Sequence, residues 1–365
     1  MAGRVTIQDI ADSLGISRNT VSKAINNSPG LAEGTRAKIL QRAAEMGYKQ
    51  FSYLSQMSPD LLSPVQPGAP SGAGTAQETA GREIAFFTAG FLFGSHFAIT
   101  MLDQFQLELS KWGYTLTMHR ISQEELQALR LPVTFSRRRT SGIICAELFQ
   151  MDYAQMLMEL ELPLLFADSP VGLSRLPFRA DRLMMDNRQC IRSFVAHMVE
   201  NGKRQFGFIG HVRHCQSFFE RYLALQEALL LQELTLSPAL CITGTFQEKE
   251  YPSGEEYRSY LKGQLAALDH LPDVFLCAND FVAMDTLLVL RQLGLSVPED
   301  VMLCGFDDSP ESRFISPSLT TVRIHSKDMG TCALQMLLSR INNPDIAPRT
   351  LYVSTDLIYR ESAPL

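Results

Sequence analysis

The sequence lacks the features that mark an exported, membrane-spanning or disulfide-stapled protein. Its first residues have neither the basic start nor the apolar run of a signal peptide, and no later apolar run approaches the ~20 residues that a membrane span needs. The seven cysteines are odd in number and show no CxxC spacing, so we expect reduced and mostly buried thiols. These absences predict a cytoplasmic protein.

Motifs of enzymes and cofactor sites are also missing. The sequence has no GxSxG elbow, no phosphate-binding loop and no GxGxxG fingerprint, and the GFIG run at 207–210 is typical of a strand end. His211, His214 and Cys215 have a spacing that suits a metal, but no second cluster or HExxH helix accompanies them. We therefore expect no enzymatic activity, no cofactor and no bound metal.

Charge and length indicate several domains of different character. A chain of 365 residues with 45% hydrophobic side chains exceeds one compact core and predicts two or three domains. Residues 1–60 hold seven basic and five acidic side chains, so they carry +2 of the net charge of -6, and the remainder carries -8. A basic N-terminal head on an acidic body indicates that a polyanion would bind to the head.

Residues 7–25 have the pattern of two short helices joined by a tight turn. Thr6 is a good N-cap for a helix over 7–14, whose apolar residues recur at helical spacing, and Gly15 can end that helix with a positive φ. Ser17 is a good N-cap for the second helix. A third helix, beginning near Thr35 and stopping at Gly47, would close a small core.

The second helix presents a polar face that carries Arg18, Asn19, Ser22 and Lys23. Two such helices predict a helix-turn-helix, in which the polar start of the second helix enters the major groove of DNA. The alternative is an ordinary helical hairpin with a solvated polar face.

VTIQDIADSLGISRNTVSKAINN, followed by TRAKILQRAAEMGY, resembles the DNA-binding head of the lactose-repressor-like (LacI/GalR) family of bacterial transcription regulators. The resemblance implies that Arg18 and Asn19, with Lys23 one turn later, read bases. Arg suits the O6/N7 pair of guanine and Asn the N6/N7 pair of adenine. The candidates for phosphate contacts are Thr6, Ser17, Thr20, Ser22 and Asn26. For Thr6 and Ser17, helix capping alone is the alternative.

After Tyr48 the sequence departs from this family pattern. The family has a Pro two residues later and then a hinge helix whose Leu wedges into the minor groove, whereas Gln50 replaces the Pro here. Met57 falls at the wedge position, where it could intercalate or serve as generic packing. We therefore divide the chain into a head over 1–49, a divergent hinge over 50–57, a linker over 58–82 and a body over 83–365.

The segment over 58–82 is rich in Pro, Gly, Ala and Ser and predicts a flexible linker. A coil of this length has a root-mean-square reach of roughly 25 to 30 Å. The family usually crosses from hinge to body in a few residues. We therefore expect weaker coupling between effector and DNA than is normal for the family.

From residue 83 onward, apolar runs alternate with segments long enough for helices. The runs are IAFFTA, GIICAE, LPLLFAD, FGFIG, VFLCAND and VMLCGFDD. This alternation predicts an α/β body with doubly wound parallel sheets in two lobes, attached to the all-α helix-turn-helix head.

The same region resembles the effector domain of the family, which is built like a periplasmic sugar-binding protein. The phrases that carry the resemblance are MDN at 185–187, SFFERYLAL at 217–225, CANDFVAM at 277–284, VPEDVMLCGFDDSP at 297–310, SPSLTTVR at 316–323 and YRES at 359–362. It implies that the chain crosses between the lobes near Asp186, Pro317 and Leu351. It also implies a small-molecule effector, a sugar or sugar derivative, in the cleft between the lobes.

Three effector-binding residues follow from this resemblance. Arg221 stands where the family has a ligand-gripping arginine, and its planar fork of donors can hold two hydroxyls or a carboxylate. Asn279 and Asp307 follow apolar strands, where an amide and a carboxylate can take complementary hydroxyl hydrogen bonds. The alternative for Asp307 is that it caps a helix or pins a turn.

Further effector-binding candidates follow two other strands of the first lobe: Ser95, His96, Phe97 and Asp168. Phe97 is the expected stacking platform for a sugar ring, and a surface-loop role is the alternative for His96. After SGII the family often has a polar residue that meets the ligand, whereas Cys145 and Ala146 follow here.

The resemblance implies a cytoplasmic, nucleoid-associated transcription regulator, a repressor, that binds a near-palindromic double-stranded DNA operator as a homodimer. A small-molecule effector would control it, and no membrane partner is expected. The alternative is a cytosolic sugar-binding protein with little autonomous DNA reading, against which the absent export signal and the complete helix-turn-helix pattern both argue.

Overall fold

The computed structural model describes residues 6–25, 35, 38, 39, 42, 46, 82–90, 96–172, 177–244 and 254–365. The chain divides into two units, Met1–Gln77 and Glu78–Leu365, each of which is described by itself. None of the helices in these described ranges is long and apolar enough to cross a membrane.

The head begins with α1 (Ile7–Leu14) and α2 (Arg18–Ile25), so the two predicted helices are confirmed. Gly15 ends α1 in the left-handed region with φ 64°, and its N–H donates to the carbonyls of Ala11 and Asp12. The core is formed by one apolar face of each helix together with a residue of the third segment: Ile10, Ala11, Val21, Ala24 and Ile39. Thr35, Lys38, Ile39 and Arg42 are helical, while the stop expected at Gly47 lies outside the described residues.

The first lobe of the body is built on a parallel sheet of six strands in the order β10-β5-β4-β3-β1-β2. The strands are β1 (Glu83–Thr88), β2 (Thr115–Arg120), β3 (Thr140–Ala146), β4 (Leu164–Ala167), β5 (Asp181–Met185) and β10 (Thr350–Val353). The order 2-1-3-4-5 within this sheet is a common doubly wound arrangement.

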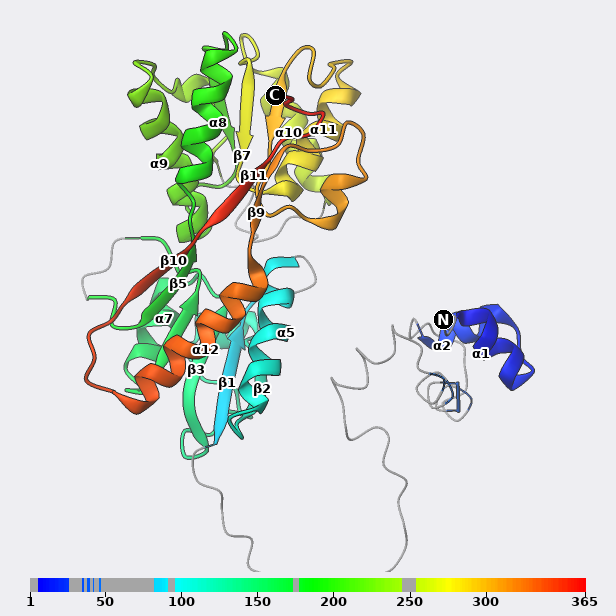
Figure 1. The fold of residues 1–365 in the computed structure, drawn as a ribbon, viewed down its shortest axis with the longest axis vertical. Coiled ribbons are helices and arrows are strands. Elements are labelled where there is room, and N and C mark those ends of the chain that lie inside the picture. The colour runs from blue at the N-terminus through cyan, green and yellow to red at the C-terminus, as the bar shows by residue number, and fades with distance from the viewer. Residues whose placement is uncertain are drawn as a thin grey trace, which may run out of the picture. The chain divides into compact units, whose positions relative to one another are not determined.

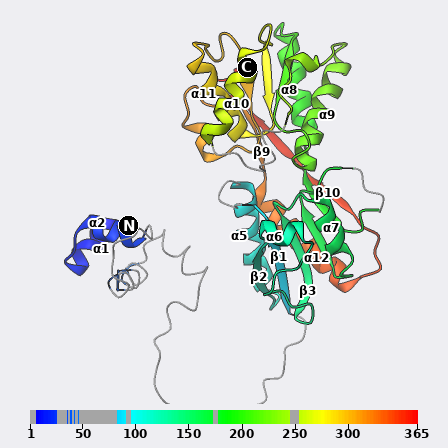
Figure 2. The ribbon, with the colours of Figure 1, turned by 180° about the vertical axis from the view of Figure 1, so that it is seen from behind.

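Helices cover both faces of this sheet (Figures 1 and 2). Along β1, Ile84 and Phe86 join the core under α5 (His96–Ser110) and α12 (Ser326–Asn342). Ala85 and Phe87 join the core under α6 (Gln123–Gln127) and α7 (Met151–Met158). Because successive side chains point to opposite faces, a strand buried on both faces has to be apolar throughout, which explains the run IAFFTA.

The second lobe contains a three-stranded parallel sheet formed by β6 (Phe206–Ile209), β7 (Val274–Cys277) and β8 (Met302–Cys304). Phe208 and Leu276 pack with residues of α8 (Gln189–Glu200) and α9 (Gln216–Leu231). Phe275 and Cys277 pack with residues of α10 (Gly254–Ala266) and α11 (Asp280–Gln292). Two short 3-10 helices, η3 (Pro238–Leu240) and η4 (Pro310–Arg313), complete this lobe. The α/β fold of two doubly wound lobes is therefore confirmed.

The chain crosses between the lobes at three places, two of which differ from the prediction. It crosses between β5 and α8, at the predicted Asp186, then between β9 (Thr321–Ile324) and α12, and finally between β10 and β11 (Thr355–Ile358). Pro317 precedes β9, whose pairing with β11 delays the second crossing to Ile324. Leu351 lies inside β10, paired with Leu183 of β5, so the third crossing also comes later. Figure 1 shows β9 and β11 together at this junction.

All seven cysteines are free, and five of them are buried. Burial raises the pKa of the Cys277 thiol to about 12, which keeps it protonated and inert. The prediction of mostly buried thiols is confirmed.

Candidate functional site

The second helix of the head presents its polar face to solvent. Arg18, Asn19 and Lys23 are exposed, whereas Val21 and Ala24 on the opposite face are buried. The base-reading candidates therefore lie on the free surface of α2, and their side chains can reach a ligand without any rearrangement of the core.

One of the phosphate-contact candidates, Ser17, caps this helix, and a second, Thr20, lies in its first turn. The Ser17 Oγ accepts a hydrogen bond from the Thr20 N–H at 3.1 Å and lies 2.8 Å from the Thr20 Oγ1. Thr20 and Ser22 are partly buried. Capping leaves both hydroxyls at the N-terminus of α2, where backbone N–H groups and the helix dipole favour an anion. The predicted contacts at Asn26 and Met57 lie outside the described residues.

Thr6 caps α1 through a capping box with Asp9. The Thr6 N–H and hydroxyl each donate to the Asp9 Oδ2 at 2.7 Å, and the Thr6 Oγ1 accepts from the Asp9 N–H at 3.3 Å. These hydrogen bonds from Thr6 lower the pKa of Asp9. The capping alternative raised for Thr6 therefore holds in this structure, and its exposed position leaves room for a phosphate contact as well.

The body brings Arg221 and Asp307 together. Arg221, on α9, is 2% exposed; its Nε donates to the Asn187 Oδ1 at 2.9 Å and its Nη1 to the Ala278 carbonyl at 2.6 Å. Its Nη2 lies 3.8 Å from the Asp307 Oδ1, and its guanidinium lies over the Phe306 ring, 3.5 Å from the ring centroid. Two donor groups of the fork are thus occupied, and the third faces the carboxyl of Asp307, another effector-binding candidate.

Asp307 is held in an unusual backbone and electrostatic state. It follows β8 with φ 119°, a region that disfavours every residue except Gly, and its N–H donates to the Val322 carbonyl at 2.8 Å. Burial outweighs the attraction of Arg221 and raises the pKa of Asp307 to about 8, helped by the nearby charges of Asp280 and Glu147. At neutral pH this carboxyl can donate a hydrogen bond as well as accept one.

Asp168 ties the two lobes together beside this pair. It follows β4 of the first lobe with φ 60°, and its Oδ1 accepts from the Ser169 N–H at 2.7 Å and from the Ser217 N–H of α9 at 3.2 Å. Burial raises the pKa of Asp168, although these hydrogen bonds and Arg221 oppose the rise. A carboxyl of one lobe thus lies at the N-terminus of a helix of the other.

Several polar residues of this site were not among the predicted ones. The Asn187 Nδ2 donates to the Glu220 Oε2 at 2.9 Å, and the Glu220 Oε1 accepts from the Tyr352 hydroxyl at 2.9 Å. Asn187 belongs to the phrase MDN, which is the signal that could have identified it. Glu147, the residue after Cys145 and Ala146, directly follows β3, and its charge helps to raise the pKa of Asp307.

The remaining candidates of the body have mixed surroundings. Asn279 is the N-cap of α11, where its Oδ1 accepts from the Val282 N–H at 3.0 Å. His96 stacks on Phe281 of the other lobe, and its Nε2 lies 2.9 Å from the Glu311 Oε2. Phe97 is 9% exposed in the apolar core, and Ser95 lies outside the described residues. Effector contacts by these four residues remain predictions.

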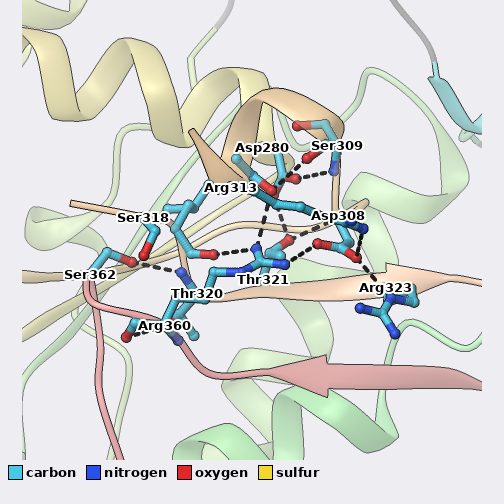
Figure 3. A network of polar contacts seen from close by, with 12 residues as sticks. Asp280, Asp308, Ser309, Arg313, Ser318, Thr320, Thr321, Arg323, Arg360 and Ser362 are labelled. Atoms are coloured by element: carbon cyan, nitrogen blue, oxygen red, sulfur yellow. Dashed lines mark hydrogen bonds and ion pairs between the residues drawn. The ribbon is translucent and has the colours of Figure 1, made fainter. Parts of the chain in front are cut away.

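A polar network anchors the residues that directly follow Asp307 (Figure 3). The Asp308 carboxylate accepts from Arg313 and Arg323, each at 2.7 Å, and from Arg360 of the C-terminal segment. Burial raises the pKa of Asp308, but these hydrogen bonds outweigh burial, so the pKa lies below its ordinary value. The segment that presents Asp307 is therefore fixed to β9.

Buried Asp280 holds the next residue of the same segment. Its Oδ1 accepts from the Thr321 hydroxyl at 2.5 Å and its Oδ2 from the Ser309 N–H at 2.7 Å. Burial raises the pKa of Asp280 to about 6. Together with Asp308, this residue connects the effector candidates to β9, the strand that directly precedes the second crossing between the lobes.

His214, one of the three residues whose spacing suits a metal, lies among aromatic side chains. His214 packs against Phe149 and Phe218, with ring centroids 5.0 and 5.1 Å away, and burial lowers the pKa of His214 to about 4. Within the part of the chain that the structure describes, no group of three His, Cys, Asp or Glu side chains is placed to hold a metal ion.

Two sequence-family models match the parts of the chain described above. One, the "Bacterial regulatory proteins, lacI family", matches residues 6–50 and so covers α1 and α2. The other, the "Periplasmic binding protein-like domain", matches residues 195–363 of the body. The chain belongs to the lacI family of bacterial regulatory proteins.

Relatives of this lacI-family chain share its whole length. It is 23% identical to the HTH-type transcriptional repressor PurR of Aliivibrio salmonicida and 26% identical to the HTH-type transcriptional regulator CelR of Thermobifida fusca, with 98% of each chain covered in both cases. Its fold matches that of a transcriptional regulator CelR–cellobiose complex with a TM-score of 0.65 at 23% identity, covering 98% of this chain and 100% of the other. It also matches a lac repressor dimer bound to operator and the anti-inducer ONPF with a TM-score of 0.63 at 18% identity, with both chains fully covered.

Proposed function

We propose that this lacI-family chain is a sequence-specific DNA-binding transcription regulator, a repressor, whose operator binding is controlled by a small molecule held between the two lobes of its body. The observation that carries this proposal is the exposed polar face of α2, presented by a cap and a core that match the family pattern from residue 6 to residue 50. The protein would act in the bacterial cytoplasm, at the nucleoid.

In the head, Arg18, Asn19 and Lys23 would read base edges in the major groove, since α2 exposes all three. Thr6, Ser17, Thr20, Ser22 and Asn26 would position the head on phosphates. A single short helix reads few bases, so two heads on a near-palindromic operator are needed for specificity, which requires a homodimer.

In the body, the effector would bind where Arg221, Asp307 and Asp168 converge. A neutral Asp307 carboxyl beside the Arg221 fork offers a donor, an acceptor and a cation within one site, which suits the adjacent hydroxyls of a sugar. Binding can shift the equilibrium between lobe arrangements only if the ligand prefers one of them. Cellobiose in the similar CelR complex supports a carbohydrate effector.

We further propose the domain division given above, with a head over 1–49, a hinge over 50–57, a linker over 58–82 and a body over 83–365. Apart from Arg82, the hinge and the linker lie outside the described residues. If the long linker weakens coupling, shortening it should strengthen the response of DNA binding to the effector.

The test is selection of bound duplexes from a randomised DNA library by the purified full-length protein at near-physiological salt. We expect a near-palindromic consensus that Arg18→Ala loses or relaxes. Lys38→Ala is the matched control, since it removes one exposed cation of the same head outside α2 and should leave the consensus unchanged. Folded protein that recovers no consensus would instead support the sugar-binding alternative.

A further inference from the structure

Cationic side chains gather at one edge of the first-lobe sheet. All strands of this sheet are parallel, so their N-terminal ends lie along the same edge. At the start of β1, Glu83 pairs with Thr115 of β2 on one side and Thr140 of β3 on the other. The residues that precede these three strand starts are Arg82, Lys111, Arg137, Arg138 and Arg139, all of them exposed. We call this set the basic edge.

The backbone of the basic edge is fixed by hydrogen bonds. The Ser136 carbonyl accepts from the Arg139 N–H at 3.1 Å and from the Thr140 hydroxyl at 2.9 Å, which closes the arginine-bearing turn. The Arg139 carbonyl accepts from the Glu83 N–H at 3.2 Å, and the Arg82 carbonyl accepts from the Thr115 N–H at 2.9 Å. The arginines therefore project from a turn that is tied directly to the central strands.

Two of these arginines have no side-chain partner among the residues that the structure describes. Arg139 lies 3.6 Å from the Glu83 carboxylate, and Lys111 lies 2.8 Å from the Glu108 carboxylate. Arg137 and Arg138, by contrast, form no side-chain hydrogen bond or ion pair with any described residue. Adjacent exposed guanidinium groups repel each other, and an external anion would relieve that repulsion.

The basic edge differs in charge from the rest of the body. Residues 61–365 carry a net charge of -8, so most of the body surface repels a polyanion. On the same edge, the acidic Glu159 and Glu161 precede β4, the strand next to β3.

The chain enters the body at this edge. Arg82 is the residue immediately before β1, and everything N-terminal to it leads to the head. When a head is on DNA, covalent geometry limits the distance to the basic edge to about 3.3 to 3.6 Å for each intervening residue. Tethering of this kind raises the effective concentration of DNA phosphates at the edge, so even weak contacts become populated.

We propose that the basic edge is a second DNA-binding surface, which holds the phosphate backbone beside the operator through Arg137 and Arg138 without reading sequence. The inference rests on the proposed function, because the head must bring the DNA. Phosphates are the appropriate ligand because two neighbouring guanidinium forks can each take an anionic oxygen pair. The surface would add affinity that falls as salt rises and would leave specificity to α2.

The test measures binding of the full chain to two duplexes over a range of salt concentrations. One is a duplex of about 60 base pairs that carries the two selected half-sites at its centre, so that DNA flanks them on both sides, and the other is a mixed-sequence duplex of the same length. Arg137→Ala/Arg138→Ala should weaken binding to both duplexes by a similar factor, and the slope of log K against log salt should become shallower by about one for each phosphate that the variant no longer binds. Arg18→Ala should instead reduce the preference for the selected duplex and leave the salt slope nearly unchanged.

A matched control is Lys262→Ala/Lys327→Ala, which removes two exposed cations from α10 and α12. This control should bind like the wild type, and equal thermal midpoints of all variants would show that folding is intact. The inference is overturned, and the proposed function stands, if the double arginine variant keeps the same salt slope as the lysine control while the wild type still selects a consensus. If the wild type binds neither duplex at any salt concentration, the proposed function fails together with it.

Discussion

The guanidinium of Arg221 lies over the ring of Phe306, with its Cζ 3.5 Å from the ring centroid. Phe306 immediately precedes Asp307, whose Oδ1 lies 3.8 Å from the Arg221 Nη2. The end of one strand therefore supplies both an aromatic face and a carboxyl to the same arginine. In a desolvated setting a cation–π contact contributes about 2 kcal/mol, so Phe306 helps to hold the fork in the position that a ligand would meet.

Replacing Arg221 should separate its structural role from its role in binding. Arg221→Ala leaves the Asn187 Oδ1 and the Ala278 carbonyl without their donor, and we expect the free energy of unfolding to fall by about 3 kcal/mol in a urea titration. Arg221→Lys keeps a cation but loses the planar fork, so most of the stability should remain while the effector response disappears. A normal effector response in Arg221→Lys would contradict this role.

Asp307→Asn should make stability less dependent on pH. The raised pKa means that the folded protein keeps a proton that the unfolded chain has released, over the window from 3.8 to about 8. The wild type therefore loses stability as pH rises through that window, and the variant does not share this loss. We expect the thermal midpoint of Asp307→Asn, relative to wild type, to rise with pH up to about 8 and then to level off.

The control for that experiment is Asp345→Asn, which removes an exposed carboxylate from the same lobe-spanning body. Its difference from the wild type should show no comparable trend across the window. If the thermal midpoints of Asp307→Asn and the wild type differed by the same amount at every pH, burial would not raise the pKa of Asp307.

The stability that Asp308 contributes should depend on pH in the opposite direction to that of Asp307. Its three arginine partners lower its pKa, so the stability that it contributes is present above its ordinary pKa of 3.8 and is lost as pH falls below that value. Asp308→Asn should lower the free energy of unfolding by about 3 kcal/mol at neutral pH, because it leaves Arg360 and its neighbours without their carboxylate. The difference in the free energy of unfolding between Asp308→Asn and the wild type should shrink at acid pH. A difference that grows at acid pH would be inconsistent with the network.

In the head, Ser17→Ala and Arg18→Ala should have different consequences. Removing the Ser17 cap should destabilise the head by about 1 kcal/mol, with binding to every duplex weakened in parallel. Arg18→Ala should leave the thermal midpoint unchanged and reduce discrimination at one base pair by about 1 to 3 kcal/mol. Affinities for duplexes that differ at a single base pair distinguish the two variants. If Arg18→Ala discriminated between such duplexes as well as the wild type does, Arg18 would not be a base-reading residue.

The parts of the fold that could be predicted were those with strong local signals. Six apolar runs correspond to β1, β3, β4, β6, β7 and β8, because strands buried on both faces must be apolar. Strands β2 and β10 lie at the two edges of their sheet and keep several exposed positions, so their sequences carry no such run. Two of the three crossing points were misplaced for a related reason, since the pairing of β9 with β11 is a long-range contact that neither segment signals by itself.

The candidate site was predictable where a polar residue follows an apolar strand or stands at a family position. Arg221, Asp307 and Asp168 follow strands or occupy a family position, and the structure brings all three together. Asn187 and Glu220 were missed because their role is to hold Arg221 and one another, which depends on distances between α9 and the end of β5. Asn279 has two uses, and its capping of α11 cannot be separated from ligand binding by sequence.

The most direct test of an effector-controlled DNA-binding protein is a titration of its affinity for the selected duplex with mono- and disaccharides, cellobiose among them, in the wild type and in Arg221→Lys. We predict that at least one sugar changes the affinity of the wild type by about 5- to 150-fold and leaves Arg221→Lys unaffected. A sugar that binds the protein tightly but leaves the affinity of the wild type for DNA unchanged would contradict this account.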